Sequence, residues 1–401
     1  MTPTSCPTRS LAAAAVFVVG ISLMLLVGCA ARKQEPGAVA VPANGFVKNW
    51  GADLGLKRDA AERIFLRDDL VFLYTESNRS YVLSAAGGQL LSSNTITAPG
   101  SEIRPPVLLG DKIVYLALAA IEVYDRRGRL ISSIPLDRAT RSPAAVGPGN
   151  VMYFGVDYHN GGRLLKYDVT RQFGKVLWEL MTFAPISASP AVYEDAVYAA
   201  SEDGRTYAVA SNRDPIWPID GNTFMTAGRV LADLKVDDFG LYVASMDSKL
   251  YCLDRQTGRI KWTYFAGRPL REPPVVLPDR VYQYVPGRGL VSIDKTEGKA
   301  MREVVWAAPG ARRFLSADDA NVYVLASDNA IVALDKATGE PKFRSKRRDL
   351  TITTPNTKDA TIYAATKRGE VLAIRPVLKG GSVGEIVLDE RTIMAPLSRA
   401  E

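Results

Sequence analysis

The chain is poor in the residues that most catalytic and metal sites use. Its 401 residues include one histidine, His159, and three cysteines. Because His159 stands in a turn-like stretch, DYHNGG, between two expected strands, we predict neither a Ser-His-Asp triad nor a histidine-based zinc site. No other catalytic constellation is visible in the sequence. We therefore expect no enzymatic activity, no metal and no cofactor.

Long apolar runs are also missing, apart from one at the N-terminus. Arg9 precedes an uncharged stretch from Leu11 to Gly28 that is rich in Ala, Val and Leu. A basic residue, an apolar core and small residues at the break predict a secretory signal peptide over residues 1–28. The ending Leu-Val-Gly-Cys resembles the bacterial lipobox, which implies that Cys29 is lipidated and anchors the protein to a membrane. The alternative is a transmembrane segment that ends in a chance cysteine.

The stretch that follows the signal peptide is expected to connect the lipid to a folded body. Residues 29–45 contain Pro, Ala and Gly without apolar periodicity, which predicts a lipidated flexible tether. Ala30 stands where, in many lipoproteins, an Asp favours retention in the inner membrane. This indicates an outer-membrane protein that faces the periplasm. Cys252 is then the only thiol of the folded body, where we expect it to be buried and structural.

An apolar residue followed by Tyr, once by Phe, recurs at intervals of roughly forty residues, the period of one propeller blade. The eight pairs are Val71-Phe72, Val114-Tyr115, Met152-Tyr153, Val197-Tyr198, Leu241-Tyr242, Val281-Tyr282, Val322-Tyr323 and Ile362-Tyr363. A unit of this size cannot bury its own apolar faces, so the copies must stack, and radial stacking closes a ring. We predict an all-β, eight-bladed β-propeller of four-stranded antiparallel blades. A seven-bladed ring with an extra hairpin is the alternative, because the first copy is weak.

Each copy alternates apolar and polar residues and breaks at turn residues, as half-buried strands do. In the copy after Arg271, the four strands are expected at PPVVL, RVYQYV, GLVSID and KAMREVVW. We expect the aromatic residue that ends the fourth strand to pack between blades rather than to stack on a ligand: Trp178, Trp217, Trp262, Trp306 and Phe343. We expect a repeated acid to cap a turn rather than to bind a metal: Asp125, Asp168, Asp254, Asp294 and Asp335.

The predicted propeller spans residues 46–390, and residues 391–401 form a C-terminal tail. Trp50 precedes the first full copy, so the segment from Phe46 to Leu56 is expected to supply a strand to the last blade. The stretch from Gly384 to Leu388 could do the same from the other end. Closure of this kind removes exposed sheet edges.

The formal net charge of +7 is modest for a chain of this length. Without a basic stripe on a suitable fold, we expect no nucleic-acid partner. Four arginines stand about ten residues before an apolar-Tyr pair: Arg104, Arg141, Arg271 and Arg312. We predict that they rim the central channel on one face and contact acidic segments of a protein partner. The alternative is that they point into solvent.

The repeat, seen in LYVASMDSKLYCLDRQTGRIKW from Leu241 to Trp262, resembles the pyrroloquinoline-quinone-type (PQQ-like) propeller repeat. Together with the ending at Cys29, it resembles the BamB family of lipoproteins of outer-membrane β-barrel assembly. The resemblance implies a scaffold that binds the barrel-inserting subunit through inter-blade loops on one face. In that family a Leu-Arg pair helps to dock the partner. Residues 184–190 lack the pair, and Leu270-Arg271 is the candidate here.

Two other functions stay open at this point. A propeller lipoprotein of the cell envelope could bind a polysaccharide or a peptide instead of an assembly subunit. The enzymatic branch of the repeat family, the quinoprotein dehydrogenases, needs a Ca²⁺ site, a catalytic Asp and commonly two adjacent cysteines. This sequence has no adjacent cysteines, which disfavours that branch.

Overall fold

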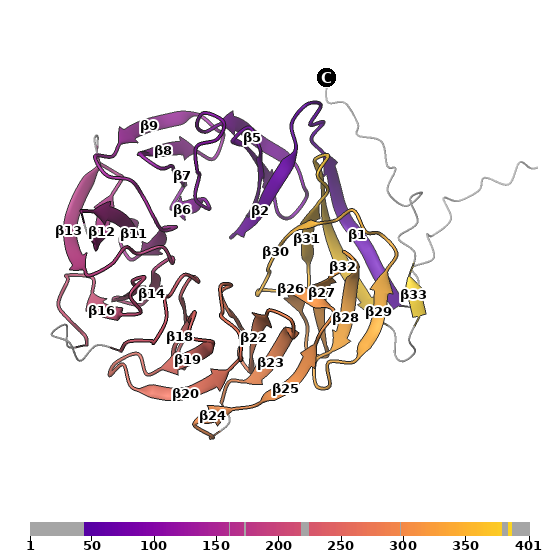
Figure 1. Cartoon of the computed structure of the whole chain (residues 1–401). Coiled ribbons are helices and arrows are strands. Elements are labelled where there is room, and N and C mark those ends of the chain that lie inside the picture. The colour runs from indigo at the N-terminus through magenta and orange to yellow at the C-terminus, as the bar shows by residue number, and fades with distance from the viewer. Residues whose placement is uncertain are drawn as a thin grey trace, which may run out of the picture. The chain divides into compact units, whose positions relative to one another are not determined.

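The computed structural model describes residues 44–378 and 384–386, apart from residues 160, 172–173, 218–223 and 297. The predictions for the signal peptide 1–28, for Cys29 and for the tail 391–401 lie outside the described residues. The described residues all belong to one compact unit. Its described strands form eight sheets arranged as a ring (Figure 1). The predicted all-β, eight-bladed propeller is therefore confirmed.

The first four blades follow one another along the chain. Blade 1 consists of β2 (Ala61–Arg67), β3 (Leu70–Thr75), β4 (Arg79–Ser84) and β5 (Leu90–Thr95), and blade 2 consists of β6 (Val107–Leu109), β7 (Lys112–Leu116), β8 (Ala120–Asp125) and β9 (Leu130–Pro135). Blade 3 consists of β10 (Ala145–Gly147), β11 (Val151–Tyr158), β12 (Gly161–Asp168) and β13 (Lys175–Thr182), and blade 4 consists of β14 (Ala191–Tyr193), β15 (Ala196–Ala200) and β16 (Thr206–Ala210).

The last four blades complete the ring. Blade 5 consists of β17 (Lys235–Val236), β18 (Leu241–Ala244), β19 (Lys249–Leu253) and β20 (Ile260–Phe265), and blade 6 consists of β21 (Val275–Val276), β22 (Arg280–Val285), β23 (Gly289–Asp294) and β25 (Val304–Ala308). Blade 7 consists of β26 (Ala311–Ala317), β27 (Asn321–Ala326), β28 (Ile331–Asp335) and β29 (Pro341–Ser345), and blade 8 consists of β30 (Ile352–Thr354), β31 (Ile362–Ala365), β32 (Glu370–Leu378) and β1 (Asn44–Asp53).

Closure of the ring agrees with the sequence at one end of the chain and not at the other. The N-terminal strand β1 pairs antiparallel with β32 and completes blade 8, as predicted, although it begins at Asn44 rather than Phe46. The C-terminal strand β33 (Gly384–Ile386) does not join the last blade. It pairs in parallel with β29 and adds a fifth strand to blade 7, so the prediction for Gly384–Leu388 is wrong. β1 already occupies the outer edge of β32, which leaves no place there for a second strand.

Two other strand predictions need correction. The stretch KAMREVVW is not one strand, because Met301–Arg302 forms a separate strand, β24, that pairs in parallel with β20 of blade 5. Blade 4 has three strands in the described part of the chain. Where a fourth was expected, two isolated bridges occur, Val209 with Pro215 and Arg205 with Met225.

The apolar core lies between neighbouring blades rather than inside each one. All eight apolar-aromatic pairs fall on the second strand of a blade and are at most 7% exposed. One core cluster joins Tyr323 of blade 7 to Leu372 of blade 8, and another joins Tyr282 of blade 6 to Phe314 of blade 7. Cys252 is fully buried in a third cluster, and burial raises the pKa of its thiol to about 12. The prediction of a buried structural thiol is confirmed.

The aromatic residues of the outer strands pack between blades, as predicted. Each tryptophan of the chain donates its indole N–H to a backbone carbonyl oxygen of the next blade around the ring. The pairs are Trp50 with Ala85 (2.8 Å), Trp178 with Ser211 (2.7 Å), Trp217 with Arg255 (2.9 Å), Trp262 with Lys295 (3.0 Å) and Trp306 with Lys336 (2.9 Å). Every acceptor follows the third strand of its blade, so the same type of contact joins neighbouring blades at five of the eight junctions.

The repeated acids close the turns between third and fourth strands, and three of these turns, at Asp254, Asp294 and Asp335, also hold a tryptophan's acceptor. In each turn, Oδ1 of the aspartate accepts hydrogen bonds from backbone N–H groups two to four residues ahead, for example from Ala337 (2.8 Å) and Thr338 (2.9 Å) at Asp335. The other four turns have the same arrangement, at Asp125, Asp168, Asp254 and Asp294. The predicted role of these residues in turn capping is confirmed.

Candidate interaction face

One face of the ring, which we call the connection face, carries the eight segments between blades and the turns between second and third strands. The two kinds of segment are tied together by hydrogen bonds. The side-chain amide of Asn78, in the turn of blade 1, donates to the carbonyl oxygens of Ala98 (2.7 Å) and Ser101 (2.8 Å) in the next connection. In blade 2, Thr140 donates its N–H to the carbonyl oxygen of Leu118 (2.8 Å). These bonds give the connection face a defined backbone.

The four predicted arginines are distributed around this face on different blades. Arg104, Arg141 and Arg271 lie in connections, whereas Arg312 is the second residue of β26. The guanidinium of Arg104 pairs with Glu102 and donates to the carbonyl oxygen of Thr140 (3.1 Å), and its side chain is 14% exposed. Arg141 pairs with Asp157 at 2.7 Å. Two of the four charges are thus partly neutralised in place, and a single positive rim around the channel stays a prediction.

Arg271 and Arg312 are more accessible to a partner than Arg104 and Arg141. Both are exposed. Within the described residues, the Arg312 guanidinium has one weak hydrogen bond, to Oδ1 of Asn329 (3.3 Å). Arg271 has neither a hydrogen bond nor an ion pair there. Its neighbour Leu270 is completely buried in the core cluster that holds Trp262 and Tyr264. The prediction that Leu270 contacts a partner is therefore wrong, because its side chain supports the packing of blades 5 and 6.

A cavity of about 390 Å³ between blades 6 and 7 brings Arg312 close to the residue after Arg271. Its lining includes Glu272, Arg312, Arg313 and the aromatic rings of Tyr282, Tyr284 and Phe314. Burial raises the pKa of Glu272, and the positive charges of Arg313 and Arg312 oppose this effect. The site combines positive charge with aromatic surface, which suits a carboxylate or a polar side chain of a protein partner.

The sequence did not identify the exposed apolar residues of the connection face. Five large apolar side chains at the connection-face ends of blades 2–5 are 45–67% exposed: Leu118, Met181, Phe183, Met225 and Phe265. The guanidinium of Arg205 lies 4.2 Å from the centre of the Phe183 ring. Exposed apolar side chains gathered on neighbouring elements mark surfaces that bind other proteins. No single sequence signal marks them, because Leu118 lies in a turn after a second strand, Met181 lies within β13 and Phe183 lies directly after it.

The described ranges hold no cluster of three or more His, Cys, Asp or Glu side chains that could bind a metal ion. His159 lies at the turn that follows β11, in left-handed backbone with φ of 43°. In the same ranges, no helix is long and apolar enough to cross a membrane.

Comparison with known proteins places the chain in a family. The family model described as outer membrane protein assembly factor BamB matches residues 117–230, 216–317 and 300–399, which is more than half of the chain. The chain belongs to this family. The resemblance inferred from the repeat is thereby confirmed for the BamB-type propeller. A comparison with curated protein sequences gives no match.

Solved structures agree with the BamB-type fold. BamB from Moraxella catarrhalis superposes with a TM-score of 0.62 at 18% identity, covering 82% of this chain and 97% of that one. The computationally designed protein Ika8 superposes with a TM-score of 0.63 at 14% identity, covering 81% of this chain and 98% of that one. At these identities the similarity shows a common propeller architecture. A designed protein shares it, so the fold by itself does not define a function.

Proposed function

We propose that this protein is a lipid-anchored, non-enzymatic scaffold of the cell envelope that binds a protein partner in outer-membrane protein assembly. Membership of the BamB family supports this role, and the N-terminal sequence that ends at Cys29 supports anchoring at the outer membrane on the periplasmic side. The observation that carries the binding role is the row of exposed apolar side chains on the connection face. A scaffold needs such a surface because burial of apolar area drives association.

The chemistry of this surface fits protein binding better than catalysis. Phe183, Met225 and Phe265 are 67%, 53% and 58% exposed and come from three consecutive blades. Large aromatic and methionine side chains beside arginine are enriched in protein interfaces. Arg205 lies over Phe183 and keeps a positive charge beside the apolar contact. A partner that covers these residues would also approach the cavity at Arg312.

Affinity purification of the full-length chain from mildly solubilised membranes of its own cell tests the proposal. We expect mass spectrometry to identify the central barrel-inserting subunit of outer-membrane assembly among the retained proteins. Failure to retain that subunit, while the chain itself is recovered folded and lipidated, would contradict the proposed function.

A further inference from the structure

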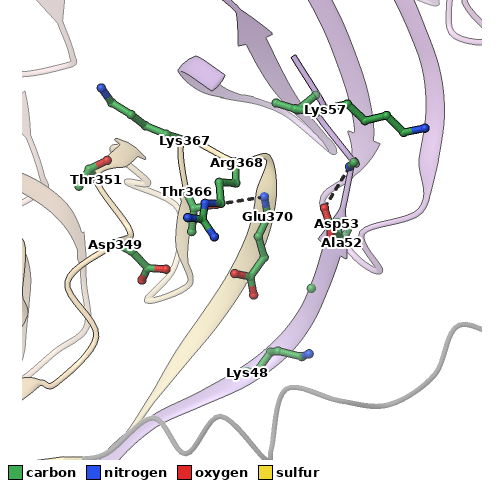
Figure 2. Close-up of a pocket in the computed structure, with 13 residues that line it drawn as sticks. Lys48, Ala52, Asp53, Lys57, Asp349, Thr351, Thr366, Lys367, Arg368 and Glu370 are labelled. Carbon is green, nitrogen blue, oxygen red and sulfur yellow. Dashed lines mark hydrogen bonds between the residues drawn. The ribbon is translucent and has the colours of Figure 1, made fainter. Parts of the chain in front are cut away.

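A second site lies on the connection face, on the far side of the ring from the exposed apolar residues. It is a groove of about 1290 Å³ where blade 8 meets blades 7 and 1, and we call it the seam groove (Figure 2). The residues that line it are Lys48, Gly51, Ala52, Asp53, Gly55, Leu56, Lys57, Asp349, Thr351, Thr366, Lys367, Arg368 and Glu370. They come from β1, from the connections before β2 and β30, and from the turn between β31 and β32.

The acidic residues of the seam groove already have partners within the protein. Arg347 binds Asp349 through two hydrogen bonds, of 2.6 Å and 3.0 Å, and also pairs with Glu370. Although burial acts against it, hydrogen bonding to Asp349 and Glu370 raises the pKa of Arg347. Asp53 accepts the N–H of Gly55 at 3.0 Å. Arg347 therefore neutralises Asp349 and Glu370, whereas Asp53 is exposed and its negative charge is held only by this turn.

Several basic residues of the seam groove remain available. Lys57, Lys367 and Arg368 are exposed, and within the described residues no hydrogen bond or close ion pair forms at the side chains of Lys57 or Lys367. Arg368 acts on Asp349 only as a neighbouring charge. In Figure 2 the side chains of Lys57 and Lys367 point away from each other. The result is a positive field along an open depression, which attracts anions.

The turn that carries Lys367 and Arg368 is held in place by its backbone. The carbonyl oxygen of Lys367 accepts the N–H of Ala61 (2.9 Å), and that of Gly369 accepts the N–H of Leu54 (3.1 Å). Gly369 has φ of +94°, and a Cβ there would lie 2.5 Å from Leu56. Blade 8 and the connection to blade 1 are thus locked together, so the backbone that carries the two cations is fixed before any ligand binds. A backbone ordered in advance costs no further entropy on binding.

We propose that the seam groove binds an extended acidic segment of the partner protein. The groove exceeds the roughly 300–1,000 Å³ of pockets for small ligands, so it has room for several residues of a peptide. It lies on the same face as the apolar residues of blades 2–5, so one partner can reach both. A lipid surface fits less well, since no large apolar side chain in the described part of blades 7 and 8 is strongly exposed for insertion.

The inference takes one point from the proposed function, namely that the acidic segment belongs to the partner protein. Binding of an acidic segment in the seam groove does not depend on that function. Fluorescence anisotropy with a labelled hexaglutamate peptide and the purified full-length chain measures the binding directly. We expect saturable binding that weakens as salt is raised, because exposed charges are screened. The variant K367E/R368E should lower the affinity at least tenfold. The control R127E/K175E makes the same change in net charge on exposed residues at the opposite face and should alter it less than twofold.

Four results would overturn the inference. An equal loss of peptide affinity in K367E/R368E and in R127E/K175E would mean that the affinity depends only on the net charge of the protein. Phosphatidylglycerol vesicles could displace the peptide from the wild-type chain. If they do so, and if the K367E/R368E variant no longer binds these vesicles, the groove is assigned to lipid. Binding that appears only after Asp389 and Glu390 are changed to Lys would assign it to the chain's own C-terminal segment. Because membrane purification of the partner is a separate measurement, a wild-type chain that retains the partner but does not bind the peptide would reject the groove and leave the scaffold function intact.

Discussion

The indole N–H of Trp306 donates a 2.9 Å hydrogen bond to the backbone carbonyl oxygen of Lys336, which joins the outer strand of blade 6 to the turn of blade 7. The ring itself is 5% exposed and stacks on the backbone at Gly339. The contact combines apolar burial with a satisfied carbonyl, and four other junctions repeat it. Stability of the ring should therefore depend on both parts of the tryptophan, its area and its N–H group.

Replacement of Trp306 separates these two parts. Trp306→Phe keeps most of the buried area but leaves the Lys336 carbonyl without its donor, at a cost of about 1–2 kcal/mol in the free energy of unfolding. Trp306→Ala also leaves a cavity and should cost about 3–5 kcal/mol. Denaturant midpoints of the two variants measure the difference. A Phe variant as unstable as the Ala variant would show that the hydrogen bond carries the whole effect.

Gly339 should resist substitution because of the same contact. Its φ is +76°, and a Cβ at this position would lie 2.6 Å from Cδ2 of Trp306. Gly339→Ala is expected to lower the free energy of unfolding by about 1 kcal/mol or more. Gly310 is a matched control, since a Cβ there meets nothing within 4 Å. Surface substitutions of this kind change the free energy of unfolding by about 0.5 kcal/mol or less. Gly310→Ala should therefore leave the thermal midpoint within a degree or two of wild type.

Acid should weaken the turn of blade 7 over a defined pH range. The hydrogen bond from Lys342, followed by backbone N–H groups, lowers the pKa of Asp335 to about 2. A carboxylate whose pKa falls on folding stabilises the protein fully above its ordinary value near 4, and that contribution disappears as the pH falls through about 2. Since the pair with Lys342 is partly exposed, the effect should be at most about 1 kcal/mol. Asp335→Asn should be less stable than wild type at pH 6 and equally stable near pH 1.5. A constant difference over this range would exclude titration of Asp335 as the cause.

Lipid attachment at Cys29 can be tested apart from the fold. Cys29→Ser removes the thiol that would carry the lipid, so we expect the mature chain to lose its acyl mass and its firm membrane association. Mass spectrometry and extraction of membranes with carbonate measure both changes. Cys6→Ser, in the predicted signal peptide, is the control and should retain lipid. Unchanged acylation of the Cys29 variant would contradict the lipoprotein assignment.

The fold could be predicted from the sequence because each blade repeats its own pattern. Val322-Tyr323 and its counterparts marked every second strand, and the outer tryptophans marked the contacts between blades. Strands without a repeat were harder to place, since β24 and β33 pair in parallel with neighbouring blades. Such pairing depends on which sheet edge is free in space, and alternation along the chain does not encode it.

Residues of the candidate site were less predictable than the fold. Leu270 and Phe183 both stand outside regular strands, yet one is completely buried and the other is 67% exposed. Outside a strand, alternation gives no rule for which way a side chain points. The seam groove was also hidden, because its basic residues come from β1 and from segments near residues 57 and 367 that meet only when the ring closes.

The central claim, that the connection face of blades 2–5 binds a protein of outer-membrane assembly, is tested most directly with a triple variant. Phe183→Ala, Met225→Ala and Phe265→Ala remove exposed apolar side chains, whereas Leu90→Ala, Leu130→Ala and Ile260→Ala remove exposed ones from the starts of outer strands. Both triple variants should melt near the wild-type temperature, since the residues are exposed. We expect the first to lose at least tenfold of the co-purified assembly subunit and the second to retain it. Full retention by the first variant would contradict the account.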